Sequence, residues 1–108
     1  MTVVDAGTVK IGDKILKLHG VITPSARQKC KRGSLPWLCG AAARTHLVNL
    51  AQEKTVQCLK IGAYHGQCFL NGADISENMV RNGWAAPDQS GAAYRDDEEI
   101  ARAQKFGM

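Results

Sequence analysis

The chain has 108 residues, of which 44% are hydrophobic and 22% are charged, and its formal net charge is +4. This length fits one domain, residues 1–108, with a modest core, and the composition is that of an ordinary globular protein. No apolar run approaches the roughly 18–20 residues of a membrane helix, so we expect no membrane span. The chain contains no basic segment followed by a long apolar one, so we expect no signal peptide within it.

The first predicted elements are short strands joined by tight turns. Residues 3–11 indicate a strand interrupted at Gly7, and Gly12-Asp13 predicts a hairpin turn. Residues 14–21 alternate, with Leu16 and Leu18 on one face and Lys17 on the other. A two-faced strand of this kind predicts one buried and one solvated sheet face.

The middle of the chain predicts a loop followed by the central helix. Residues 25–36 are polar and basic and contain Gly33 and Pro36, which is typical of a loop. Residues 37–51 predict a helix whose buried stripe is Cys39, Ala43, Leu47 and Leu50. Pro36 then stands where a first helical turn tolerates proline.

The last part predicts a hairpin and two helices. Residues 55–61 and 64–70 indicate strands, with a turn at Asn71-Gly72. Residues 74–82 predict a short helix that stops at Gly83, followed by a short strand at 84–86 and a last helix capped by Ser90. The order of elements predicts an α+β fold, mainly β, built as a small Greek-key barrel with about three helices.

Charge is distributed unevenly along the chain. Residues 1–60 hold ten Lys and Arg against three Asp and Glu, whereas residues 61–108 hold four against seven. The densest basic cluster consists of Arg27, Lys29, Lys31 and Arg32. Such a cluster either attracts an anionic ligand or forms a solvated loop, and the sequence leaves both interpretations open.

The four cysteines indicate two disulfides. Four cysteines allow three pairings, and the pairing Cys30–Cys39 with Cys58–Cys68 is favoured because each bond joins neighbouring elements. A zinc site is the alternative, weakened because no Cys-x-x-Cys pair is present. Disulfides predict an oxidising compartment.

Three stretches carry a family resemblance: residues 4–9 (Val-Asp-Ala-Gly-Thr-Val), 17–25 (Lys-Leu-His-Gly-Val-Ile-Thr-Pro-Ser) and 64–68 (Tyr-His-Gly-Gln-Cys). Further matches are Trp37-x-Cys39-Gly40 and Gly83-Trp84-Ala85. In this order they resemble the thermonuclease (staphylococcal-nuclease-like) family, in its exported, cysteine-containing branch. The resemblance implies a five-stranded OB-type barrel and a periplasmic or secreted location.

The family's chemistry is calcium-dependent phosphodiester hydrolysis, and most residues that it implies are replaced here. Asp5 matches the first aspartate of the family's Asp-Gly-Asp-Thr motif. Lys17 stands at the first arginine. Gly7 and Ile22 stand at the two further metal-binding aspartates, Ser25 stands at the glutamate that activates water, and no arginine remains near His65. A hard Ca²⁺ ion needs several oxygen ligands, and a missing general base alone costs about 10²–10⁴ in rate.

We therefore expect a catalytically inactive, nuclease-like binding or accessory module. No catalytic or metal-binding residue is expected; Asp5 and Lys17 are remnant positions, and Asp5 is interpreted as a turn residue. The expected binding residues are Lys17, Arg27, Lys29, Lys31 and Arg32. No cofactor is expected, and calcium enters only under the alternative of a residual or altered phosphodiesterase. A third hypothesis is nucleic-acid binding without cleavage; a protein or an oligosaccharide is an equally open partner.

Overall fold

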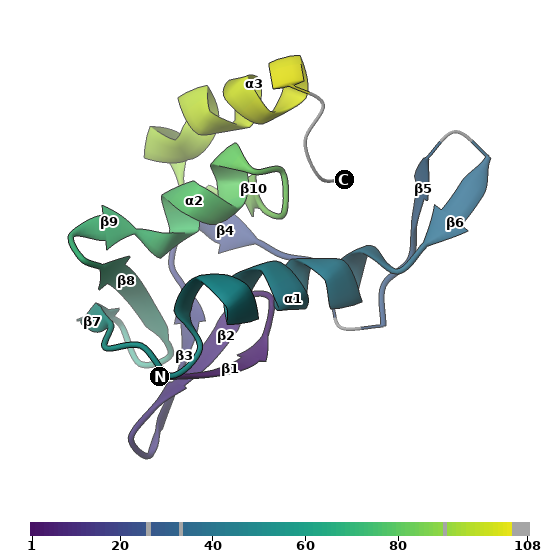
Figure 1. Cartoon of the computed structure of the whole chain (residues 1–108). Coiled ribbons are helices and arrows are strands. Elements are labelled where there is room, and N and C mark those ends of the chain that lie inside the picture. The colour runs from purple at the N-terminus through teal and green to yellow at the C-terminus, as the bar shows by residue number, and fades with distance from the viewer. Residues whose placement is uncertain (26, 33, 90, 105–108) are drawn as a thin grey trace.

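The structure is a computed structural model that describes residues 1–25, 27–32, 34–89 and 91–104, without the side chains of Arg32 and Gln104 (Figure 1). The strands are β1 Thr2–Asp5, β2 Thr8–Ile11, β3 Lys14–Leu18, β4 Val21–Ile22, β5 Cys30–Arg32, β6 Leu35–Trp37, β7 Gln57–Ile61, β8 His65–Leu70, β9 Ala73–Asp74 and β10 Ala86–Pro87. The helices are α1 Cys39–Ala51, α2 Ile75–Arg81, the 3-10 turn η1 Ala92–Tyr94, and α3 Arg95–Gln104. The expected mixed α+β class with three α-helices is confirmed for the described residues.

The main sheet has the strand order β1-β2-β3-β8-β7, with β9 added to β8. The β3–β8 pair is parallel, which requires a long crossover connection, and the chain between these strands includes α1 and β7; the other pairs are antiparallel. The sheet is not closed into a barrel. The segment after α1 lies instead along the start of β1, where the Val3 N–H donates to Gln52 Oε1 (2.8 Å) and the Glu53 N–H donates to the Met1 carbonyl (2.9 Å).

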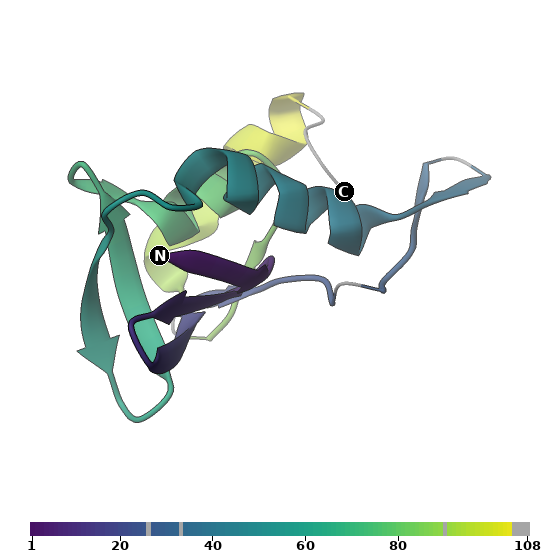
Figure 2. The same cartoon turned by 60° about the horizontal axis from the view of Figure 1, so that its bottom comes forward.

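The core lies between one face of this sheet and the helices (Figure 2). Leu16 and Leu18 are buried, while Lys17 between them is exposed, as their alternation predicts. On α1 the residues Ala43 and Leu47 are fully buried, so the predicted helical stripe faces the core. Each large apolar side chain buried in this way contributes about 1.5–3 kcal/mol relative to exposure.

The segment predicted as a loop contains a β-hairpin. Strands β5 and β6 pair from Cys30↔Trp37 to Arg32↔Leu35, and α1 therefore begins at Cys39 rather than at residue 37. Pro36 belongs to β6 and not to a first helical turn. A two-stranded ribbon has only edge strands, and an edge tolerates the missing N–H of proline.

Both predicted disulfides are present. Cys30 is bonded to Cys39, across the base of the β5–β6 hairpin, and Cys58 is bonded to Cys68, its direct partner across β7 and β8. All four cysteines are thereby used, which excludes the zinc alternative. Two disulfides are compatible with an oxidising compartment.

The C-terminal helices follow the prediction with shifted ends. Asp74 caps α2, its Oδ1 accepting from the Ser76 N–H at 2.9 Å, so the helix begins one residue later than predicted. The predicted cap Ser90 lies outside the described residues, and the strand predicted at 84–86 is β10 at 86–87. The buried Tyr94 leads into α3 and donates its hydroxyl to Asp74 Oδ2 at 2.6 Å.

No helix in the described part of the chain combines the length and the apolar character needed to cross a membrane.

Candidate functional site

The candidate site is built on a row of side chains that crosses the sheet on its exposed side. Thr8 of β2 is the direct partner of Lys17 of β3, and Lys17 is the direct partner of His65 of β8. Directly opposed residues in a sheet project from the same face. The register therefore places a hydroxyl, an ammonium and an imidazole side by side, opposite the face on which Leu16 and Leu18 are buried.

Asp5 extends this row to β1. It is the partner of Thr8 at a point where the β1–β2 register shifts, immediately before the turn at Ala6-Gly7. Asp5 Oδ1 accepts the Gly7 N–H at 2.9 Å. This bond is a local side-chain-to-backbone turn of the kind that aspartate favours. The interpretation of Asp5 as a turn residue is confirmed.

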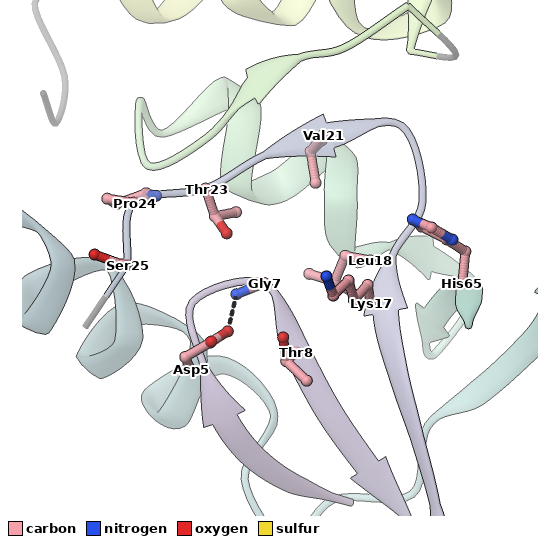
Figure 3. A pocket seen from close by; sticks show the side chains of 10 residues that line it. All are labelled: Asp5, Gly7, Thr8, Lys17, Leu18, Val21, Thr23, Pro24, Ser25 and His65. Carbon is pink, nitrogen blue, oxygen red and sulfur yellow. Dashed lines mark hydrogen bonds between the residues drawn. The ribbon is translucent and has the colours of Figure 1, made fainter. Parts of the chain in front are cut away.

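Thr23 packs closely against Gly7 at one side of the site. A Cβ atom placed on Gly7 would overlap the Thr23 hydroxyl and would lie 3.1 Å from its Cγ2. In Figure 3, Thr23 comes from the segment after β4 and lies above the Asp5–Gly7 turn. The resulting pocket has a volume of about 260 Å³ and is lined by Asp5, Gly7, Thr8, Lys17, Leu18, Val21, Thr23, Pro24, Ser25 and His65.

The pocket brings together most positions that the sequence singled out. Asp5, Gly7, Lys17, Ser25 and His65 all line it, although they come from three separate stretches of the chain. Ile22 does not line it; its side chain points to solvent with 62% of its surface exposed. Thr8 and Thr23 were missed as site residues. Thr8 could have been found from its place beside Lys17 in the hairpin register, whereas the position of Thr23 over Gly7 has no signal in the sequence.

The pocket is lined by one ammonium and one carboxylate, and their hydrogen bonds leave the ammonium available to an anion. Lys17 is exposed, and its ammonium has no hydrogen-bond or ion-pair partner among the described residues. Asp5 is the single carboxylate lining the pocket, and one of its two oxygens, Oδ1, accepts the Gly7 N–H. An unpaired ammonium next to a hydroxyl and an imidazole can hold an anion by charge and by hydrogen bonds.

The same pocket does not fit calcium. Ca²⁺ takes 6–8 oxygen ligands, with carboxylates prominent among them. The lining offers one carboxylate and the hydroxyls of Thr8, Thr23 and Ser25. Across the described residues, no group of three or more His, Cys, Asp or Glu side chains is placed to hold a metal ion.

A second hollow adjoins this pocket and shares Thr8, Lys17 and His65 with it. Its volume is about 510 Å³, and its other lining residues are Asp13, Ile15 and Tyr64. Ile15 and Tyr64 are both exposed. Lys17 and His65 therefore stand between a polar hollow and a more apolar one.

The predicted basic cluster lies apart from the pocket. Arg27 and Lys29 are exposed ahead of β5, Lys31 is exposed on β5, and none of them lines the pocket around Lys17. Arg32 belongs to β5, and its side chain lies outside the described set. The structure therefore places Lys17 in the pocket, and Arg27, Lys29 and Lys31 on or just ahead of the β5–β6 hairpin.

No family model matches the chain, and no curated protein matches it.

Proposed function

We propose that the chain is a non-catalytic binding module of the thermonuclease-like type, which holds a phosphate-bearing anion at Lys17. The observation that carries this proposal is the row of side chains Thr8, Lys17 and His65 across the sheet. Asp5, next to Thr8, is the one carboxylate that lines the pocket. A cation with neighbouring donors supports anion binding. A site with one carboxylate and no second acidic group does not support a calcium centre, and Ser25 stands where the family resemblance places the glutamate that activates water.

An OB-type framework is part of this proposal. An OB fold is a five-stranded, partly open Greek-key barrel. Five strands in the order β1-β2-β3-β8-β7, with a helix in the crossover before β7, are compatible with a version of that barrel left open between β1 and β7. The two disulfides support a periplasmic or secreted location.

The test is a titration with a fluorescently labelled single-stranded oligonucleotide at low and at moderate salt. Lys17→Ala is compared with Lys60→Ala, which removes one exposed lysine of β7 outside the pocket. We expect Lys17→Ala to weaken binding and to lower the slope of log affinity against log salt by about 1, because a single phosphate contact is lost. Equal affinity of the two variants would remove Lys17 from the site.

A parallel incubation with millimolar calcium separates this proposal from the residual phosphodiesterase. We expect no cleavage of DNA or RNA with or without calcium. Calcium-stimulated cleavage that disappears in Asp5→Ala would refute the non-catalytic proposal. Binding that is salt-dependent and yields no product would identify nucleic acid as the class of ligand.

A further inference from the structure

The β5–β6 hairpin projects from the body of the protein. Both views show it extending beyond the start of α1, away from the main sheet (Figures 1 and 2). Its base is held by the Cys30–Cys39 disulfide and by the Gly40 N–H, which donates to the Gln28 carbonyl at 3.2 Å. The hairpin is thus a tethered element rather than a free loop.

Apolar side chains on and beside this hairpin face solvent. Leu35 is 72% exposed and Leu38 is 55% exposed, and Pro36 between them is exposed as well. A hollow of about 300 Å³ lies between Lys29, Pro36, Trp37 and Leu38. A single exposed leucine is ordinary, but a projecting ribbon that presents several apolar groups together indicates an interaction surface.

The charge around the hairpin has one sign. No Asp or Glu occurs between Asp13 and Glu53, and the Lys and Arg residues in that interval number seven. Arg27, Lys29 and Lys31 are exposed; Lys29 lines the same hollow as Pro36 and Leu38, and Lys31 is the direct partner of Pro36. The acidic residues gather at the other end of the chain, where Asp96 and Glu99 are exposed on α3.

We propose that the β5–β6 hairpin docks on an anionic lipid surface. Leu35 and Leu38 would enter the headgroup region, and Arg27, Lys29 and Lys31 would contact the lipid phosphates. Basic residues close to an anionic leaflet and apolar groups buried at its boundary are the two contributions that hold peripheral proteins on membranes. Nucleic acid matches the charge but not the exposed leucines, since its sequence-independent contacts are phosphate pairs and aromatic stacking.

The proposal is tested by co-sedimentation of the whole chain with vesicles. Vesicles of phosphatidylcholine with phosphatidylglycerol are compared with vesicles of phosphatidylcholine alone. We expect binding to the anionic vesicles only, and quenching of tryptophan emission by brominated lipids, because Trp37 lies at the base of the hairpin. This wild-type measurement needs no variant, and failure to bind the anionic vesicles would overturn the proposal.

Two matched pairs of variants distinguish the hairpin from general basicity. Lys29→Glu/Lys31→Glu should lower partitioning more than tenfold, since each lost cation costs about fivefold. Lys10→Glu/Lys60→Glu carries the same net charge and should retain much more binding. Leu35→Ser should lower partitioning by up to roughly tenfold, whereas Leu59→Ser, on a leucine 64% exposed in β7, should not.

Equal losses in the paired variants would show attraction through net charge and would refute hairpin docking. Oligonucleotide binding that is lost in Lys29→Glu/Lys31→Glu, with no effect of Leu35→Ser on vesicles, would assign the hairpin to nucleic acid instead. Far-UV circular dichroism and disulfide mapping show whether each variant has folded. The variants change exposed side chains, so we expect native spectra.

Discussion

The contact of Thr23 with Gly7 makes the shape of the pocket testable by substitution. Gly7 is buried, and a methyl group at this position would overlap the Thr23 hydroxyl and approach Cγ2 to 3.1 Å and Cβ to 3.2 Å. Threonine is β-branched and stiff at χ1, so its side chain cannot turn away freely. Gly7→Ala should therefore lower the free energy of unfolding by about 1–3 kcal/mol, the usual cost of overpacking.

The assay is a double-mutant cycle in urea. Thr23→Ala removes the hydroxyl and Cγ2 and leaves Cβ as the remaining close atom. In that background, Gly7→Ala should lower the free energy of unfolding by less than it does in the wild type, which gives a coupling free energy of about 0.5–3 kcal/mol between the two sites. Unchanged m-values would confirm that the native state stays compact. An equal cost of Gly7→Ala in both backgrounds would refute the contact.

The same geometry bears on attempts to restore a nuclease site. Gly7→Asp alone would place a longer, charged side chain against Thr23 and close to Asp5. We expect this variant to be less stable than Gly7→Ala and not to bind calcium, because an unpaired buried charge adds to the overlap. Calcium binding by Gly7→Asp, measured by calorimetry, would show that the pocket is more adaptable than its packing implies.

Three further predictions concern stability. Cys58→Ala/Cys68→Ala should lower the free energy of unfolding in urea by about 2.7 kcal/mol from chain entropy for a separation of 10 residues, and by more through lost packing because Cys68 is fully buried. Cys30→Ala/Cys39→Ala should cost a similar amount, because the separation is 9 residues and Cys39 is also fully buried. Tyr94→Phe should lower the free energy of unfolding by about 1.5 kcal/mol, because it removes the hydrogen bond to the Asp74 carboxylate. An equal loss of stability from Tyr94→Phe in an Asp74→Ala background would argue against that bond. Burial, followed by the hydrogen bond and charge of Asp74, raises the pKa of Tyr94 above 10.0. The tyrosine of the unfolded chain therefore ionises first, and the free energy of unfolding should fall as the pH rises above about 10. Tyr94→Phe should lack this fall.

Local patterns in the sequence predicted most elements because short-range chemistry determines them. The Gly12-Asp13 turn, the alternation of Leu16 and Leu18, and the Asn71-Gly72 turn each depend on backbone conformation or on periodicity. Gly12 and Gly72 indeed have positive φ angles, of 61° and 81°. The β5–β6 hairpin was missed because its residues are basic and contain proline and glycine, a composition typical of a loop, although the Cys30–Cys39 disulfide at its base was predicted.

The candidate site likewise has a part that is predictable from the sequence and a part that is not. The chemical groups available to the site follow from residue identity alone: one carboxylate at Asp5, a lysine at 17, and no acidic group at positions 7, 22 or 25. Which of these groups lie close together depends on the fold. Only the parallel pairing of β3 with β8 brings His65 beside Lys17, and only the path of the chain after β4 places Thr23 over Gly7. Residue identity is local, whereas strand order and close packing depend on contacts between segments far apart in the chain.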